Sequence, residues 1–295
     1  MAPRVAVTGA SGFCGRHVVR ALQECGMSVV SVGRTAPVGL THRHWDAAGP
    51  LVPNLHGIDA VIHLAAAVGD SGHVAEFHAV NVDGTRRLLA AAADLPVVHV
   101  SSASVYSADV PRSNITEAHP VGGHGDAYSV TKLSGEQLAL NSHKVVLRPH
   151  AVYGPGDPYL IPRLSRAVRA SQLILPGPDV QLSLTAVENL AEACVAAIDW
   201  PAGPYNICDA APYSRDEMVT SSLIAMGSPV TVRHAPVALL RTAARLAELL
   251  QPSPMTTVYA VDQLAKDFTL SCDRAYHQGW RPTLQAGDHL ASLNH

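Results

Sequence analysis

Short apolar runs alternate with longer amphipathic stretches through the first 150 residues of the chain. The apolar runs are nearly continuous and rich in β-branched residues, as expected of parallel strands that are covered on both faces. They occupy residues 4–8, 27–32, 59–65, 96–101 and 144–149, and helix-like segments lie between them at 13–25, 84–93 and 128–142. This strand–helix alternation predicts an α/β fold with a doubly wound parallel sheet.

The pattern changes after about residue 155. Five prolines interrupt it, at positions 155, 158, 162, 176 and 178, and helical periodicity becomes more frequent. We therefore expect a sheet domain over residues 1–155 and a smaller, mostly helical substrate-binding lobe over residues 156–295, which is interwoven with the sheet.

A glycine-rich turn stands where the first strand meets the first helix. In "VTGASGFCG", Gly9, Gly12 and Gly15 give the spacing G-x-x-G-x-x-G. Such glycines allow a tight turn, a close approach of the backbone to a pyrophosphate, and close helix–strand packing. The free N–H groups and positive dipole end of the following helix favour phosphate. The motif predicts a Rossmann-like domain that binds a dinucleotide.

The bulk composition favours a soluble protein without a nucleic-acid partner. Its 295 residues are 47% hydrophobic, and the formal charge of −3 gives no indication of a nucleic-acid partner. The five cysteines are widely spaced without C-x-x-C, which favours a reducing compartment. No apolar run reaches 18 residues and no signal-peptide pattern opens the chain, so we expect no membrane span and a cytoplasmic location.

Sixteen histidines raise the question of a metal site. They are scattered, and no H-E-x-x-H or comparable ligand spacing occurs. The densest cluster, "HRH" at 42–44, is better explained as a solvated loop or a short strand, so we expect no metal.

A tyrosine and a lysine four residues apart suggest proton transfer. Tyr128 and Lys132, in "AYSVTK", would share one face of a helix. A phenol has a pKa near 10, and a nearby ammonium group lowers it by favouring the phenolate. Alone, such a pair is more often an ordinary feature of a helix surface, but "SSASVY" at 101–106 and "LRPHAVYGPG" at 147–156 accompany it.

Together these motifs resemble the extended short-chain dehydrogenase/reductase family, also called the NAD-dependent epimerase/dehydratase family. T-G-x-x-G-x-x-G, S-S-x-x-V-Y, Y-x-x-x-K and R-P-x-x-V-Y-G-P-G occur in order, and the similarity extends from Val5 to about Pro282. The inserted helix-like segment 236–251 makes the chain more similar to the 3β-hydroxysteroid-dehydrogenase and dihydroflavonol-reductase branches than to compact sugar-nucleotide epimerases. This segment is expected to pack within the lobe, or alternatively to meet a membrane surface or a partner.

The resemblance implies a set of site residues. Ser102 would hold the substrate oxygen, Tyr128 would move the proton, Lys132 would assist it and hold the nicotinamide ribose, and Asn81 would support them. The residues expected to bind the cofactor are Thr8, Gly9, Ser11, Gly12, Phe13, Cys14, Gly15, Arg34, Asp46, Ala47, Leu64, Ala65, Ala66, Tyr128, Lys132 and Pro149.

The end of the second strand bears on the choice of cofactor. Gly33 stands where an acidic residue would bind a ribose 2′-hydroxyl, and Arg34 can pair with a 2′-phosphate. NADP(H) is therefore the preferred cofactor, with NAD(H) as the alternative. Asp46 matches the acidic residue that lies near the adenine in the family. Alternatively, it simply caps a helix.

Three functions stay open at this point. The leading one is hydride transfer between a nicotinamide cofactor and a secondary alcohol or ketone. The second is epimerisation or dehydration of a nucleotide sugar with tightly bound NAD, and the third is non-catalytic dinucleotide sensing. The resemblance also suggests a homodimer.

Overall fold

A seven-stranded parallel sheet forms the centre of the protein. The computed structural model describes residues 2–69, 74–123, 126–158, 160–225, 227–250 and 257–285. The strand order is β11-β6-β5-β4-β1-β2-β3. The strands are β1 (Arg4–Thr8), β2 (Ser28–Gly33), β3 (Thr41–His44), β4 (Ala60–His63), β5 (Val97–Val100), β6 (Val145–Pro149) and β11 (Gly203–Ile207).

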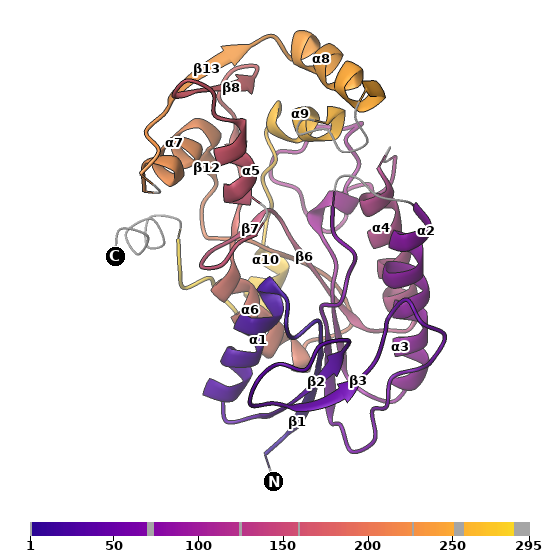
Figure 1. The fold of residues 1–295 in the computed structure, drawn as a ribbon. Helices are drawn as coiled ribbons and strands as arrows, with labels where there is room; N and C mark the ends of the chain where they lie inside the picture. Colours follow the sequence, from indigo (N-terminus) through magenta and orange to yellow (C-terminus); the bar gives the residue numbers. More distant parts are fainter. Residues whose placement is uncertain are drawn as a thin grey trace.

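Helices cover both faces of this sheet (Figure 1). Residues of β1 alternate between the two apolar cores, with Val5 and Val7 in one and Ala6 in the other. On the Val5 face lie α1 (Phe13–Glu24) and α6 (Val187–Ala196), and on the other lie α2 (Val74–His78), the π-helical turn η1 (Ala79–Gly84), α3 (Thr85–Ala91) and α4 (Ala127–Asn141). The predicted doubly wound Rossmann-like fold is confirmed.

The lobe sits beyond the carboxyl ends of the strands (Figure 1). It contains the parallel pair β8 (Gln172–Pro176) and β13 (Thr231–Ala235), the short pairs β7 (Val152–Tyr153) with β10 (Thr185–Ala186) and β9 (Gln181–Leu182) with β12 (Tyr213–Ser214), and the helices α5 (Leu160–Ala167), α7 (Arg215–Ala225), α8 (Val237–Leu250) and α9 (Val258–Leu264). The remaining elements are η2 (Ala103–Val105), η3 (Ala197–Asp199) and α10 (Asp273–His277). In an open α/β sheet, ligands bind at this carboxyl edge.

The two parts of the chain share the central sheet. Its edge strand β11 and the covering helix α6 both come after residue 155, and β11 pairs with β6 over five residues. The "HRH" cluster lies in β3, the short strand at the opposite edge, which pairs with β2.

Helix α8 packs onto the lobe through one face only. Ala244 is buried and Arg241 lies 3.3 Å from a carboxylate oxygen of Asp262. Four leucines on the rest of the helix are exposed, namely Leu239, Leu246, Leu249 and Leu250. Within the described part of the chain, no helix has the length and apolar character needed to cross a bilayer.

Candidate active site

The turn between β1 and α1 depends on its three glycines in different ways. Gly9 has a φ of +70°, which side-chain-bearing residues rarely adopt. A Cβ on Gly15 would lie 2.0 Å from the Gly9 carbonyl oxygen, so only glycine permits this helix–strand contact. Gly12 has a φ of −75°, and a Cβ there would lie 3.2 Å from the same oxygen. The backbone at Gly9 and Gly15 therefore requires glycine. Gly12 instead leaves the part of the turn that lines the cavity without a side chain.

The start of α1 is open to an anionic ligand. Gly12 provides no side-chain cap, and the first turn carries no acidic residue. Ser11, Phe13 and Cys14 line the cavity beside this turn. Burial raises the pKa of the Cys14 thiol to about 11, so it stays protonated at neutral pH. The positive end of the helix dipole thus faces the cavity without a competing carboxylate.

The end of β2 borders the same cavity. Arg34 is exposed on the lining, and a Cβ added to Gly33 would meet no atom within 4 Å. Asp46 and Ala47 also line it, and the Asp46 carboxylate accepts a 3.0 Å hydrogen bond from the Ala48 N–H. This bond closes a turn and no helix begins there, so the alternative reading of Asp46 as a helix cap was wrong.

Thr8 is placed behind the cavity wall. It is fully buried and absent from the lining. Its hydroxyl oxygen accepts hydrogen bonds from the N–H groups of Leu64 and Ala65, each 3.1 Å long. Leu64, Ala65 and Ala66 line the cavity, so Thr8 shapes the loop that would meet a cofactor.

A buried hydrogen-bond chain runs from Thr8 through His63 to Thr85, the first residue of α3. His63 lies between the Thr8 hydroxyl, 2.7 Å from Nδ1, and the Thr85 hydroxyl, 3.1 Å from Nε2. Thr85 donates its proton to the Asn81 carbonyl at 2.8 Å, so it accepts from His63, and Thr8 donates to the other nitrogen. Burial lowers the pKa of His63 to about 3, which keeps the ring neutral as this chain requires.

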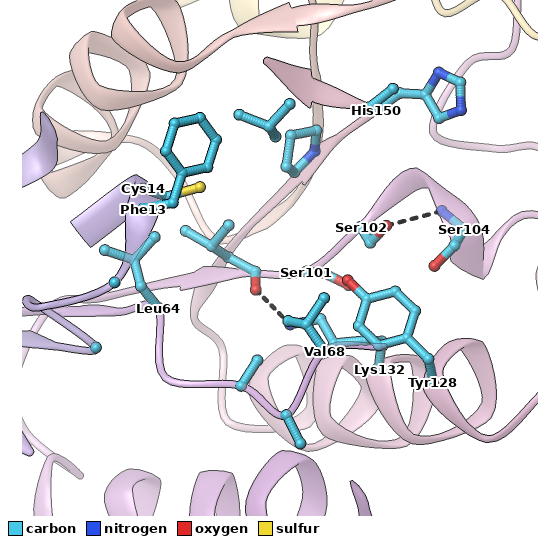
Figure 2. Close-up of a pocket in the computed structure, with 18 of the residues that line it drawn as sticks. Phe13, Cys14, Leu64, Val68, Ser101, Ser102, Ser104, Tyr128, Lys132 and His150 are labelled. Carbon is cyan, nitrogen blue, oxygen red and sulfur yellow. Dashed lines mark hydrogen bonds between the residues drawn. The ribbon is translucent and has the colours of Figure 1, made fainter. Parts of the chain in front are cut away.

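Tyr128 and Lys132 lie one turn apart on α4 and both line the cavity. The Lys132 ammonium donates a 2.7 Å hydrogen bond to the Val100 carbonyl, and burial lowers its pKa to about 8. Tyr128 packs edge-on against Phe77, with ring centroids 6.5 Å apart. Figure 2 shows its hydroxyl pointing toward the end of β5 that carries Ser101 and Ser102.

Serine hydroxyls gather at this end of β5. The Ser102 hydroxyl oxygen accepts a 3.1 Å hydrogen bond from the Ser104 N–H, which caps η2 and fixes the side chain (Figure 2). Ser101 and Ser104 also line the cavity, and their hydroxyls find no hydrogen-bond partner among the described residues. Buried hydroxyls without a partner are costly, so a ligand polar group that bonds them would be stabilised here.

Asn81 supports the site without lining it. Its side-chain oxygen accepts from the Ala67 N–H at 2.8 Å, and its amide nitrogen donates to the Ala67 carbonyl and to the Thr131 hydroxyl, both at 3.1 Å. The side chain thus holds the loop after β4 against α4. This geometry makes Asn81 a positioning residue, and direct contact with a substrate stays a prediction.

One cavity of about 1510 Å³ joins these groups. All the residues expected at the site line it except Thr8 and Asn81. A ligand pocket commonly measures about 300–1,000 Å³, so this cavity has room for a dinucleotide and a second ligand. Sequence reasoning missed Val68, His150 and the lobe residues of the wall, although His150 directly follows the recognised Pro149.

Comparisons with known proteins identify the family of this chain. The family model described as "NAD dependent epimerase/dehydratase family" matches residues 5–208. The chain is 31% identical to the 4-hydroxy-2-methyl-3-oxo-4-farnesyl-3,4-dihydroquinoline-1-oxide ketoreductase of Stigmatella aurantiaca, covering 92% of this chain and 90% of the relative. It is 30% identical to the 2-alkyl-3-oxoalkanoate reductase of Stenotrophomonas maltophilia (strain K279a), over 77% and 76% of the two chains.

A solved structure shares the whole architecture. MoeE5, in complex with UDP-glucuronic acid and NAD, is 26% identical, with a TM-score of 0.74 and coverage of 98% of this chain and 96% of that one. The glycine turn, the Tyr128–Lys132 helix and the match over residues 5–208 lead to one conclusion. The chain belongs to the NAD-dependent epimerase/dehydratase family, the extended short-chain dehydrogenases/reductases, and is an enzyme of that family.

Proposed function

We propose that the protein interconverts a ketone and a secondary alcohol with a nicotinamide dinucleotide, NADP(H) by preference. The observation that carries this proposal is the pairing of Tyr128 with the buried Lys132 ammonium on the cavity face of α4. Two relatives at 30% identity or more are named as reductases of oxo compounds, which favours reduction over epimerisation.

The described residues fit a dinucleotide. Gly12 lines the cavity without a side chain, and α1 has an uncapped start at this turn. Arg34 offers a guanidinium at the end of β2 that could pair with a 2′-phosphate. When bound, the cofactor would supply or accept the hydride. Gly9, Gly12 and the first turn of α1 would hold its pyrophosphate, and Lys132 its nicotinamide ribose.

The protein's own residues would handle the proton and the carbonyl. Ser102 is fixed by the Ser104 N–H and would donate a hydrogen bond to the substrate oxygen. Tyr128 would give its phenolic proton to that oxygen during reduction and take it back during oxidation. Below a pH of about 8 Lys132 carries its positive charge, which stabilises the phenolate left behind.

The Tyr128→Phe variant tests this proposal. It should bind NADPH as the wild type does, because the ring and its packing on Phe77 remain. Loss of a positioned general acid–base lowers turnover about 10²–10⁴-fold. NADPH oxidation in the presence of a panel of ketones measures the rate, and calorimetry measures cofactor binding.

The matched control is Tyr276→Phe, which removes a phenol in α10 outside the cavity lining and should leave the rate unchanged. If Tyr128→Phe turns over ketones within a few-fold of the wild type, the proton-transfer role is wrong. Purified protein that retains NAD and interconverts a nucleotide sugar would instead establish the epimerase.

A further inference from the structure

Two large apolar side chains are exposed inside the cavity. Ile174 of β8 is 56% exposed and Val68, in the loop after β4, is 48% exposed, although both line the concave wall (Figure 2 labels Val68). Apolar surface in a concave site is typical of ligand-binding pockets, because a ligand that covers it removes it from water. Val68 belongs to the sheet part of the lining and Ile174 to the lobe part, so apolar surface is present on both.

The lobe side of the cavity carries almost no charge. Among the described residues that line it from Leu164 onward, sixteen of nineteen are apolar, and Arg169 is the one charged group. The Arg169 guanidinium donates to the carbonyls of Arg166 and Val168 at 2.6 and 2.9 Å. The side-chain oxygen of Gln263 already accepts from Arg112 at 3.1 Å.

Phe268 packs against His150 and Arg112 in this wall. It is buried, with the His150 ring 4.0 Å from its centroid and the Arg112 guanidinium 4.5 Å from the same point. The His150 Nδ1–H donates to the Ser183 carbonyl at 2.6 Å, and burial lowers the pKa of the ring to about 4. His150 therefore stays neutral at physiological pH and adds no charge to this wall.

These features discriminate between two substrate chemistries. A nucleotide sugar would bring two phosphate charges to a wall whose described residues offer one guanidinium, already bonded to carbonyls, and unpaired charges are costly to bury. An apolar chain would lose water contacts along the exposed Ile174, at about 0.8 kcal/mol per methylene that it buries.

We infer that the substrate is a ketone with an apolar chain, which places its carbonyl between Ser102 and Tyr128 and its chain along the lobe wall past Ile174. This inference rests on the proposed ketone reduction, whose site lies at the other end of the same cavity. It adds the class of substrate and excludes nucleotide sugars.

A homologous series of 2-alkanones, from five to twelve carbons, tests the inference. Each added methylene that reaches the wall should raise kcat/KM about fourfold, which is the equivalent of the 0.8 kcal/mol above. Binding of the same ketones is measured separately by calorimetry with the Tyr128→Phe variant and NADP⁺, where no turnover intervenes. UDP-glucuronic acid, measured in the same way, should show no binding.

Two variants test where the alkyl chain of the ketone binds. Ile174→Ser removes an exposed side chain, so the fold should be kept, and the rise with chain length should flatten while the rates of the shortest ketones stay the same. Ile224→Ser is the matched control, since Ile224 is 55% exposed on α7 and does not line the cavity. It should leave the whole series unchanged.

The outcomes separate the two proposals. Turnover that is independent of chain length, or an Ile174→Ser series identical to that of the wild type, would overturn the apolar substrate and leave ketone reduction standing. Binding that strengthens with chain length without any turnover would support the apolar substrate and refute ketone reduction. Tight binding of UDP-glucuronic acid would overturn the inference and favour the epimerase.

Discussion

Lys132 is the clearest case of a single residue whose surroundings set its chemistry. Its side chain is buried, and in the described part of the chain its ammonium group donates to the Val100 carbonyl. Desolvation dominates and lowers its pKa to about 8, against the attraction of Glu136. A buried charge with so little compensation costs stability, as is common where a charged group serves a reaction.

We predict that Lys132→Met abolishes turnover and alters the pH dependence of stability. Below pH 8 Lys132 is charged in both the folded and the unfolded protein. The difference in the free energy of unfolding between variant and wild type is therefore constant there. Between pH 8 and about 10.5 only the unfolded state holds the proton, so the wild type gains stability relative to the variant as pH rises. Urea unfolding of the ligand-free proteins from pH 7 to 10.5 measures this gain.

Lys266→Met, at an exposed position, is the control for that series and should track the wild type at every pH. A flat difference between Lys132→Met and the wild type across this range would show that the ammonium is not held against a desolvation cost.

The second residue-scale prediction concerns Arg34 and Gly33. A well-placed charge-assisted hydrogen bond contributes about 1.5–3 kcal/mol, which corresponds to roughly ten- to hundredfold in affinity. Arg34→Ala should therefore weaken NADP(H) by that factor and NAD(H) far less. Gly33→Asp should turn the preference toward NAD(H), because a side chain fits there without a clash and its carboxylate would repel a 2′-phosphate.

Titration of both cofactors against the wild type and the two variants provides the measurement. If Arg34→Ala weakens the affinity for both cofactors equally, or if the wild type prefers NAD(H), Arg34 does not bind the 2′-phosphate.

At the scale of elements, different glycines of the β1–α1 turn matter for cofactor binding and for folding. Gly12→Val should keep the fold, because its backbone is extended and its Cβ meets one atom at 3.2 Å, yet the side chain should block the pyrophosphate. Gly15→Ala should instead destabilise the protein by about 1–3 kcal/mol or more, because its Cβ would lie 2.0 Å from a backbone oxygen.

Thermal unfolding and cofactor calorimetry on the two variants distinguish these effects. An unfolded Gly12→Val protein, or a Gly15→Ala protein of wild-type stability, would contradict the division of roles among the glycines.

At the scale of the whole molecule, the sheet depends on residues from both halves of the chain. The α1 residues Val18 and Leu22 share a core with Leu190 and Cys194 of α6. The buried Arg148 of β6 pairs with Glu136 and donates to the Tyr106 hydroxyl, which in turn donates to Asn206 of β11 at 2.6 Å. The two halves of the chain are therefore joined through the interior around the central sheet.

We predict that the protein unfolds in one cooperative transition and that a fragment ending at residue 155 does not fold. The fragment would expose the β6 edge and the α1 face that β11 and α6 now cover. Circular dichroism during thermal unfolding tests both statements. A cooperative transition in the fragment, or two separated transitions in the full chain, would show that residues 1–155 form an independent domain. The homodimer that the family resemblance suggests stays a prediction. Light scattering, which measures the molar mass in solution, would test it.

The sequence by itself determined five of the seven strands of the central sheet and the motifs at its carboxyl edge. Residues 4–8 and 145–149 form strands where continuous β-branched apolar runs predicted them, because such runs are stable only when both faces are buried. The glycine turn and the Tyr128–Lys132 spacing were readable because both are local, within one turn or one helix.

Only the tertiary structure decided what surrounds these motifs. The roles of Thr8 and Asn81 as positioning residues depend on partners 14 to 57 residues away, such as Ala67 and Ala65, and no local pattern encodes such contacts. The lobe wall is assembled from short, irregular segments between residues 164 and 268, whose side chains converge only in three dimensions. Local periodicity therefore predicts the sheet and its motifs, whereas the lining that selects a substrate arises from long-range packing.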